Sequence, residues 1–226
     1  MQVLAILLMA AAAAGLLPEA RRARDAQDRA ALEAAAARAA AAAEKQPQNA
    51  RVHYEAALVY SYLAEVAEET RDRSAARQAA EAGIQAAERA VALEPNSAEH
   101  QRLLGSLCGQ AIPGNLVAAL KYGRRSMEAL DRAVALDPKS AVVHLSRGVG
   151  RYYLPAALGG GAEAALVDFG KAIDIDPKSG DAHLWMGLAL RRANRNGEAR
   201  EALARALQLN PARIWAKQQL EKTAAP

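Results

Sequence analysis

One short phrase recurs four times along this chain of 226 residues: Ala90-Val-Ala-Leu-Glu-Pro95-Asn-Ser-Ala, Ala133-Val-Ala-Leu-Asp-Pro138-Lys-Ser-Ala, Ala172-Ile-Asp-Ile-Asp-Pro177-Lys-Ser-Gly and Ala206-Leu-Gln-Leu-Asn-Pro211. A looser copy ends at Pro47, and the five prolines lie 48, 43, 39 and 34 residues apart. A proline cannot continue the helix before it, and a polar residue two positions later can accept bonds from the free N–H groups of the next helix. Each phrase therefore predicts a junction at which one helix ends and another begins.

The intervals between the phrases are long enough for two helices each. Their apolar residues recur at helical spacing, as at Leu103, Leu104 and Leu107, so each interval predicts an antiparallel helix hairpin. The first three intervals exceed the last, and the excess must fall inside each hairpin because the flanking motifs keep their internal spacing. We expect it at the charged turn of residues 65–73, around Ile112-Pro113-Gly114-Asn115, and in the segment 152–161.

The composition favours closely packed helices and argues against nucleic-acid binding. Hydrophobic residues make up 52% of the chain but aromatic residues only 4%, and alanine is abundant. A formal net charge of +4 is a weak attraction for nucleic acid, and few aromatic rings are available to stack on bases. We therefore expect an all-α protein without a nucleic-acid partner.

The side chains that could carry chemistry do not form a catalytic or metal-binding pattern. His53, His144 and His183 occupy the same place in different intervals, and packed helices are about 8 to 10 Å apart, so their imidazoles cannot meet at one metal ion. Cys108 is the only cysteine and has no histidine at helical contact spacing. We predict no metal, no cofactor and no enzymatic activity.

The last interval carries a family resemblance. It contains His183-x-x-Met186-Gly187-x-x-Leu190, then Ala199-x-x-x-Leu203-x-x-Ala206 and Pro211, which resembles the tetratricopeptide repeat (TPR). The resemblance implies a right-handed α-solenoid of about four antiparallel helix hairpins with elongated turns and a capping helix at each end. The turn at 152–161 has a weaker similarity to periplasmic TPR subunits that accompany tripartite (TRAP-type) transporters.

These patterns divide the chain into four segments. Residues 1–18 are predicted to be a signal peptide or N-terminal anchor, 19–46 an alanine-rich capping helix, 48–211 the repeat array, and 212–226 a C-terminal capping helix and tail. The uncharged run from Val3 to Leu17 is shorter than the roughly 20 residues of a membrane span but suits a secretory signal. The chain is thus expected in the periplasm or secreted, with no stable membrane span after cleavage. An uncleaved inner-membrane anchor and a buried N-terminal helix in a cytoplasmic protein are the alternatives.

The resemblance also implies a function, because the first helices of such repeats build a concave ligand surface. The expected function is a non-catalytic scaffold that binds a protein or peptide. The alternative is a periplasmic transport accessory that holds a small ligand or docks a solute-binding protein. The family's pattern places these residues in the groove: Arg51, Tyr54, Leu58, Arg102, Ser106, Leu145, Val149, Tyr152, Leu184, Leu188 and Arg191.

Overall fold

The computed structural model describes residues 15–224, and every regular element in that range is a helix. A helix at 15–25 is followed by α2 (Arg29–Lys45), α3 (Ala50–Glu69), α4 (Arg73–Leu93), α5 (Ala98–Gln110), α6 (Leu116–Leu136), α7 (Ala141–Tyr153), the short 3-10 helix η1 (Ala156–Leu158), α8 (Ala162–Ile175), α9 (Gly180–Arg192), α10 (Asn196–Leu209) and α11 (Ile214–Lys222). None of the helices within residues 15–224 has the length and apolar character that crossing a membrane requires.

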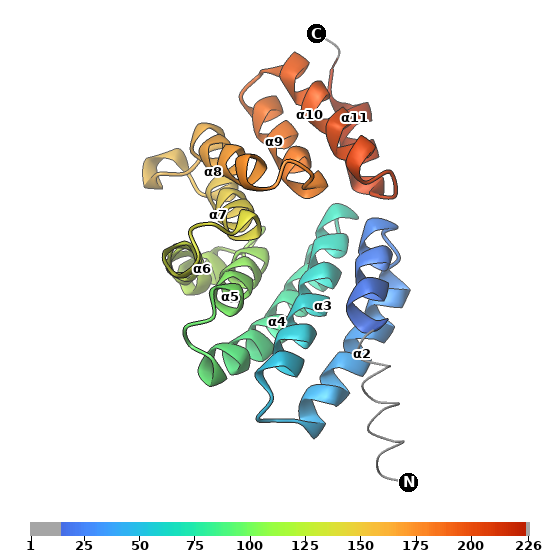
Figure 1. Ribbon diagram of the computed structural model, residues 1–226, viewed down its shortest axis with the longest axis vertical. Helices are drawn as coiled ribbons and strands as arrows, with labels where there is room; N and C mark the ends of the chain where they lie inside the picture. Colours follow the sequence, from blue (N-terminus) through green and yellow to red (C-terminus); the bar gives the residue numbers. More distant parts are fainter. Residues whose placement is uncertain (1–14, 225–226) are drawn as a thin grey trace.

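The helices pair as the repeated phrases predict. Successive helices pack in the hairpins α3–α4, α5–α6, α7–α8 and α9–α10, and the hairpins stack on one another through α3, α5, α7 and α9. Figure 1 shows the pairs following one another around a curved superhelix. The all-α solenoid expected from the sequence is confirmed.

The predicted caps stand at the starts of the first helices. The side chains of Asn49, Ser97 and Ser179 accept bonds from backbone N–H groups of α3, α5 and α9. Ser140 occupies the equivalent place before α7 but makes no side-chain cap bond. The three cap bonds satisfy N–H groups that a helix start leaves without intrahelical partners.

The excess residues of the longer intervals lie within the hairpins, as expected. The helices α3 and α4 have 20 and 21 residues, against 13 in α9 and 14 in α10 of the standard-length repeat. In the third hairpin the excess forms η1 and a turn in which Gly159 and Gly161 have φ angles of 82° and 97°. These left-handed conformations favour glycine because it has no Cβ.

The recurring glycines of the repeat are close-packing positions. A Cβ atom at Gly187 would lie 2.6 Å from Leu203 Cγ, and one at Gly105 would lie 2.7 Å from Leu130 Cγ. At Gly148 the nearest atom would be Phe169 Cε1 at 2.5 Å. In each hairpin the missing side chain lets the two helices approach.

The N-terminal part of the chain differs from the single capping helix expected over residues 19–46. The helix at 15–25 ends before a turn in which Gln27 has a φ angle of 53°, and Asp28 then caps α2 by accepting a bond from Ala31 N–H. An ion pair between Arg38 and Glu19 joins the two helices at 2.6 Å. The chain therefore begins its described part with a further hairpin, because the aspartate cap interrupts a sequence that alanine alone would keep helical.

Candidate functional site

The inner face of the superhelix is built by α3, α5, α7 and α9, the first helices of the four hairpins. All eleven residues of the predicted groove lie on these helices, but their surroundings differ. Leu184 and Leu188 are buried in a core cluster with Leu203 and Ala216. The exposed Arg51 pairs with Glu55 of its own helix at 2.8 Å. Residues Leu58, Ser106, Leu145, Val149 and Tyr152 are half-buried.

The first half of the inner face is held by a buried polar chain. Tyr54 donates a hydrogen bond of 2.8 Å to Glu99, and the Arg102 guanidinium binds both oxygens of Glu99 and reaches Ser146 Oγ of α7 at 3.1 Å. Burial and the neighbouring Glu99 carboxylate raise the pKa of Tyr54. With only 8% of its side chain exposed, Arg102 ties the second hairpin to the third.

At the other end of the inner face, Arg191 is also used inside the fold. Its guanidinium donates to the side chain and carbonyl of Gln219 and to Thr223 Oγ1, at 2.8 to 3.3 Å. The sequence predicted a solvated C-terminal face containing Gln219, whereas Gln219 is 7% exposed. The difference arises because α11 packs against the last hairpin and Arg191 needs acceptors there.

An aromatic cluster gathers where α7, α9 and α11 meet. The ring of Trp185 lies 5.7 Å from Tyr152, 6.1 Å from Tyr153 and 5.4 Å from Trp215, each in an edge-to-face arrangement. Tyr152 and Tyr153 are themselves 5.1 Å apart at 88°. Tyr153 is 56% exposed, which leaves a large aromatic surface open to solvent. Such a ring is the kind of group that anchors protein interfaces.

Sequence reasoning named Tyr152 but missed its partners. A usable signal existed, because the chain has only two tryptophans, Trp185 and Trp215, and both belong to this cluster. Trp215 follows the repeat array, so a repeat pattern cannot assign it to the inner face. Their meeting depends on how α11 folds back on the last hairpin.

The two ends of the solenoid meet in an ion cluster. We call Arg24, Asp25, Glu65, Glu69, Asp181 and Arg213 the closure cluster. Arg24 pairs with Asp181 at 2.9 Å, and Arg213 pairs with Glu65 at 2.6 Å and also with Glu69. These contacts join residues 144 to 157 positions apart. Figure 1 shows the C-terminal helices curving back to the end of α3 and to the N-terminal helices.

Burial and charge set the proton affinities in the closure cluster. Burial, reinforced by the neighbouring Glu65, raises the pKa of Glu69 to about 7. Burial alone would also raise the pKa of Asp181, but the guanidinium groups of Arg24 and Arg213 hold it below the ordinary value. The Arg213 side chain is 2% exposed. Two buried arginines thus hold several carboxyl groups at the junction of the two ends.

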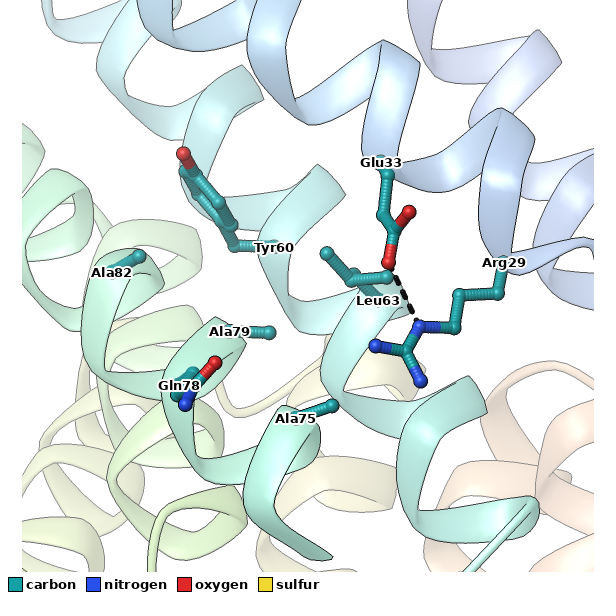
Figure 2. A pocket seen from close by; sticks show the side chains of 8 residues that line it. All are labelled: Arg29, Glu33, Tyr60, Leu63, Ala75, Gln78, Ala79 and Ala82. Carbon is teal, nitrogen blue, oxygen red and sulfur yellow. Dashed lines mark hydrogen bonds and ion pairs between the residues drawn. The ribbon is translucent and has the colours of Figure 1, made fainter. Parts of the chain in front are cut away.

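A shallow hollow lies on another part of the surface, between α2 and α4 (Figure 2). Leu63 and Tyr60 of α3 form its floor, and the ion pair of Arg29 and Glu33 stands on its α2 side at 2.8 Å. Its volume is about 220 Å³, below the 300 to 1,000 Å³ or so of typical ligand pockets. A second hollow, beside Leu17, Pro18 and Arg21, has a volume of about 290 Å³.

The remaining reactive groups serve the fold. Cys108 is fully buried, and burial raises the pKa of its thiol to about 11. His53, His144 and His183 each bond through Nε2 to the carbonyl of the proline six positions earlier, so they stabilise the junctions of their repeats. Residues 15–224 contain no group of three histidine, cysteine or acidic side chains placed to hold a metal ion.

Comparisons with known proteins point to two repeat families. The family described as "Regulator of microtubule dynamics protein 1-3" (RMD1-3) matches residues 16–154, and a tetratricopeptide repeat family matches residues 160–220. No curated protein matches the chain.

Solved structures of TPR proteins are similar to the chain. A thermophilic TPR protein of Thermus thermophilus is 17% identical, with 86% of this chain and 91% of that one covered and a TM-score of 0.65. The TPR protein YrrB, described as having an unusual peptide-binding site, is 21% identical over 84% of each chain with a TM-score of 0.46. MamA is 20% identical, covering 82% of this chain and 92% of that one, with a TM-score of 0.45.

Proposed function

The chain belongs to the family described as Regulator of microtubule dynamics protein 1-3, and because its fold is that of a TPR protein we propose that it is a non-catalytic scaffold that binds a protein or peptide partner on its inner face. TPR folds support protein binding in general. The finer parts of the proposal are the surface used and the absence of catalysis.

One observation carries the choice of surface, namely the exposed ring of Tyr153. Much of the aromatic cluster is packed, yet Tyr153 keeps 56% of its surface open at the end of α7. Its neighbours Tyr152 and Trp185 fix its position from two sides. A ring held rigidly before binding loses little conformational freedom when a partner covers it, which favours affinity.

The absence of catalysis is supported by the state of the titratable groups. Arg102, Arg147 and Arg213, whose pKa values are raised, are engaged in ion pairs within the fold. Asp168 is fully buried between guanidinium groups at 2.7 and 3.0 Å. Catalytic groups need access to a substrate, and these groups face one another.

The inner-face proposal is tested with a partner captured from the native cell and then purified. We expect Tyr153→Ala to weaken its binding at least about fivefold, as a loss of roughly 1 kcal/mol implies, chiefly through faster dissociation. Leu120→Ala is the matched control, because Leu120 is 80% exposed on α6, away from the aromatic cluster. Equal binding of the two folded variants would reject the inner face as the site.

Export from the cytoplasm is a separate proposal. It is supported by the uncharged run from Val3 to Leu17, most of which lies outside the described residues. Leu16 and Ala20 are buried in the N-terminal core cluster, so cleavage that preserves the fold must precede Leu16. N-terminal sequencing of protein expressed in a bacterial host should find a new terminus at Ala14 or Gly15. Intact Met1 in the soluble cytosolic fraction would refute export.

Two partner classes can be tested in the same binding assay. The family description names regulation of microtubule dynamics, so microtubules are one class, and they require a cytoplasmic protein. The other class is the solute-binding protein of a tripartite transporter, which requires export. That transport-accessory alternative is supported by the glycine-rich turn at 159–161, although the two hollows described above lie elsewhere.

A further inference from the structure

The aromatic rings of this chain repeatedly accept guanidinium groups. Arg192 lies over the Tyr152 ring at 4.9 Å, Arg213 over Trp215 at 5.5 Å, and Arg24 over Tyr62 at 5.1 Å. Such contacts are favourable because the negative face of the ring attracts a cation. Two of the three involve rings of the aromatic cluster, so this part of the protein is suited to positive charge.

Tyr153 is the member of the aromatic cluster that stays open. It meets Tyr152 and Trp185 edge to face, at 88° and 74°. Among residues 15–224 no lysine or arginine lies over its ring, and 56% of its surface is exposed. The ring therefore offers a second cation a place that the chain itself does not fill.

Negative charge gathers around this ring from across the inner space. The glutamates Glu65, Glu68 and Glu69 at the end of α3 all act on the Tyr153 hydroxyl and, after burial and Tyr152, raise its pKa. Glu65 and Glu69 pair with Arg213. In the described part Glu68 has no ion pair, and its Oε2 atom is buried without a hydrogen-bond partner.

The balance of charge in the neighbouring closure cluster points the same way. Four carboxyl groups, those of Asp25, Glu65, Glu69 and Asp181, share the two guanidinium groups of Arg24 and Arg213. Glu68 adds a carboxylate without a counter-ion among the described residues. An acidic ligand would be repelled here, whereas a cation would gain from both the carboxylates and the ring.

We propose that Tyr153 and Glu68 receive a lysine or arginine side chain of the partner, so that the inner face selects a basic segment. This inference rests on the proposed function and specifies the partner of the same surface. The cation lies against the open Tyr153 ring, and the Glu68 carboxylate supplies its counter-charge. The partner is therefore a protein or peptide with exposed basic residues.

Two synthetic peptides of identical Gly-Ser background test the charge preference, one carrying three lysines and the other three glutamates. The fluorescence of Trp185 and Trp215 reports binding, because both tryptophans belong to the aromatic cluster. We expect a saturable change with the lysine peptide that weakens as salt is added, and none with the glutamate peptide. No response to the lysine peptide, or an equal response to both, would overturn the proposal.

Variants locate the interaction. Tyr153→Leu keeps an apolar side chain but removes the ring, and Glu68→Gln removes the charge with little change of shape. Each should weaken binding of the lysine peptide at least about twofold, as a cation–π contact or a partly exposed charge pair implies. Glu128→Gln is the control, because Glu128 is exposed on α6 and pairs there with Arg124. Circular dichroism melts verify that each variant is folded.

The failure of this inference is distinguishable from the failure of the proposed function. If the captured partner needs Tyr153 but binds Glu68→Gln as tightly as the native protein, the inner face is the site and the charge preference is wrong. If the captured partner is insensitive to Tyr153→Ala, the proposed surface itself is wrong. Unchanged affinity of the lysine peptide for both folded variants would place its binding elsewhere and contradict the assignment to Tyr153 and Glu68.

Discussion

Replacing Arg213 by methionine should open the contact between the two ends of the solenoid. Methionine keeps much of the side-chain length but removes the charge and the donors. The guanidinium donates to Glu65 at 2.6 Å, to Glu69 Oε2 at 3.1 Å and to the carbonyl of Arg24 at 3.3 Å. The side chain is 2% exposed, so water cannot replace these bonds without rearrangement.

The expected loss follows from the charges left behind. Removing one partner of a buried ion pair typically costs about 3 to 5 kcal/mol, and we expect about 3 kcal/mol at pH 8 because Gln27 and Arg24 still contact the carboxylates. Arg124→Met is the matched control, since Arg124 is 89% exposed in its pair with Glu128. That change should cost no more than about 0.5 kcal/mol.

The loss should depend on pH through Glu69. Its pKa is about 7 in the folded protein, above its ordinary 4.5, so the folded state holds this proton more tightly than the unfolded state. The stability that proton uptake contributes is fully present below about pH 4.5 and is lost as pH rises through about 7. Protonation also removes the charge that Arg213→Met strands. The variant should therefore be less impaired at pH 6 than at pH 8, by about 1 kcal/mol.

Urea denaturation followed by circular dichroism and by tryptophan fluorescence measures these losses, and the two signals should separate if the C-terminal end opens first. Adding Glu69→Gln to Arg213→Met should recover part of the stability, because it removes a stranded charge. The reasoning would be refuted if Arg213→Met and Arg124→Met had the same unfolding free energy within about 0.5 kcal/mol at pH 8.

Two further predictions concern the interior. Gly187→Ala should destabilise the protein by about 1 to 3 kcal/mol because its Cβ would meet Leu203 Cγ at 2.6 Å, whereas Gly170→Ala, with nothing within 4 Å, should stabilise α8 by about 0.5 to 1 kcal/mol; equal urea midpoints for the two variants would contradict the packing argument. The Cys108 thiol, with a pKa raised to about 11 by burial, should resist iodoacetamide at pH 8 in the folded protein and react once urea unfolds it; rapid labelling of the native protein would show that the site opens locally.

Much of the fold could be predicted from the sequence because the signals are local. A proline stops one helix, a serine or asparagine starts the next, and a glycine marks where two helices touch. Each of these acts within a few residues, so Gly105, Gly148 and Gly187 were assigned to packing correctly. The break of residues 19–46 was missed because alanine content outweighed a single aspartate, Asp28, that caps a new helix.

The candidate site was harder to predict. A repeat pattern says which side chains point to the inner face, but not which of them the fold itself uses. Arg102 and Arg191 stand at predicted groove positions, and both are engaged by neighbours of later helices. Tyr153 falls outside the pattern that selected Tyr152, yet it carries the exposed ring. These outcomes depend on partners that the pattern does not specify.

The sequence by itself determined the hairpins, their order and the length of each, because proline, caps and glycine act on the nearest turns of the chain. Only the tertiary structure decided that the superhelix closes and that Arg24 and Arg213 share carboxylates from α3 and α9. Each hairpin adds a small rotation to the one before it, and the sum over all of them sets where the last helix arrives. No short stretch of sequence encodes that sum, so the meeting of residues more than 140 positions apart follows from the packing of the whole array.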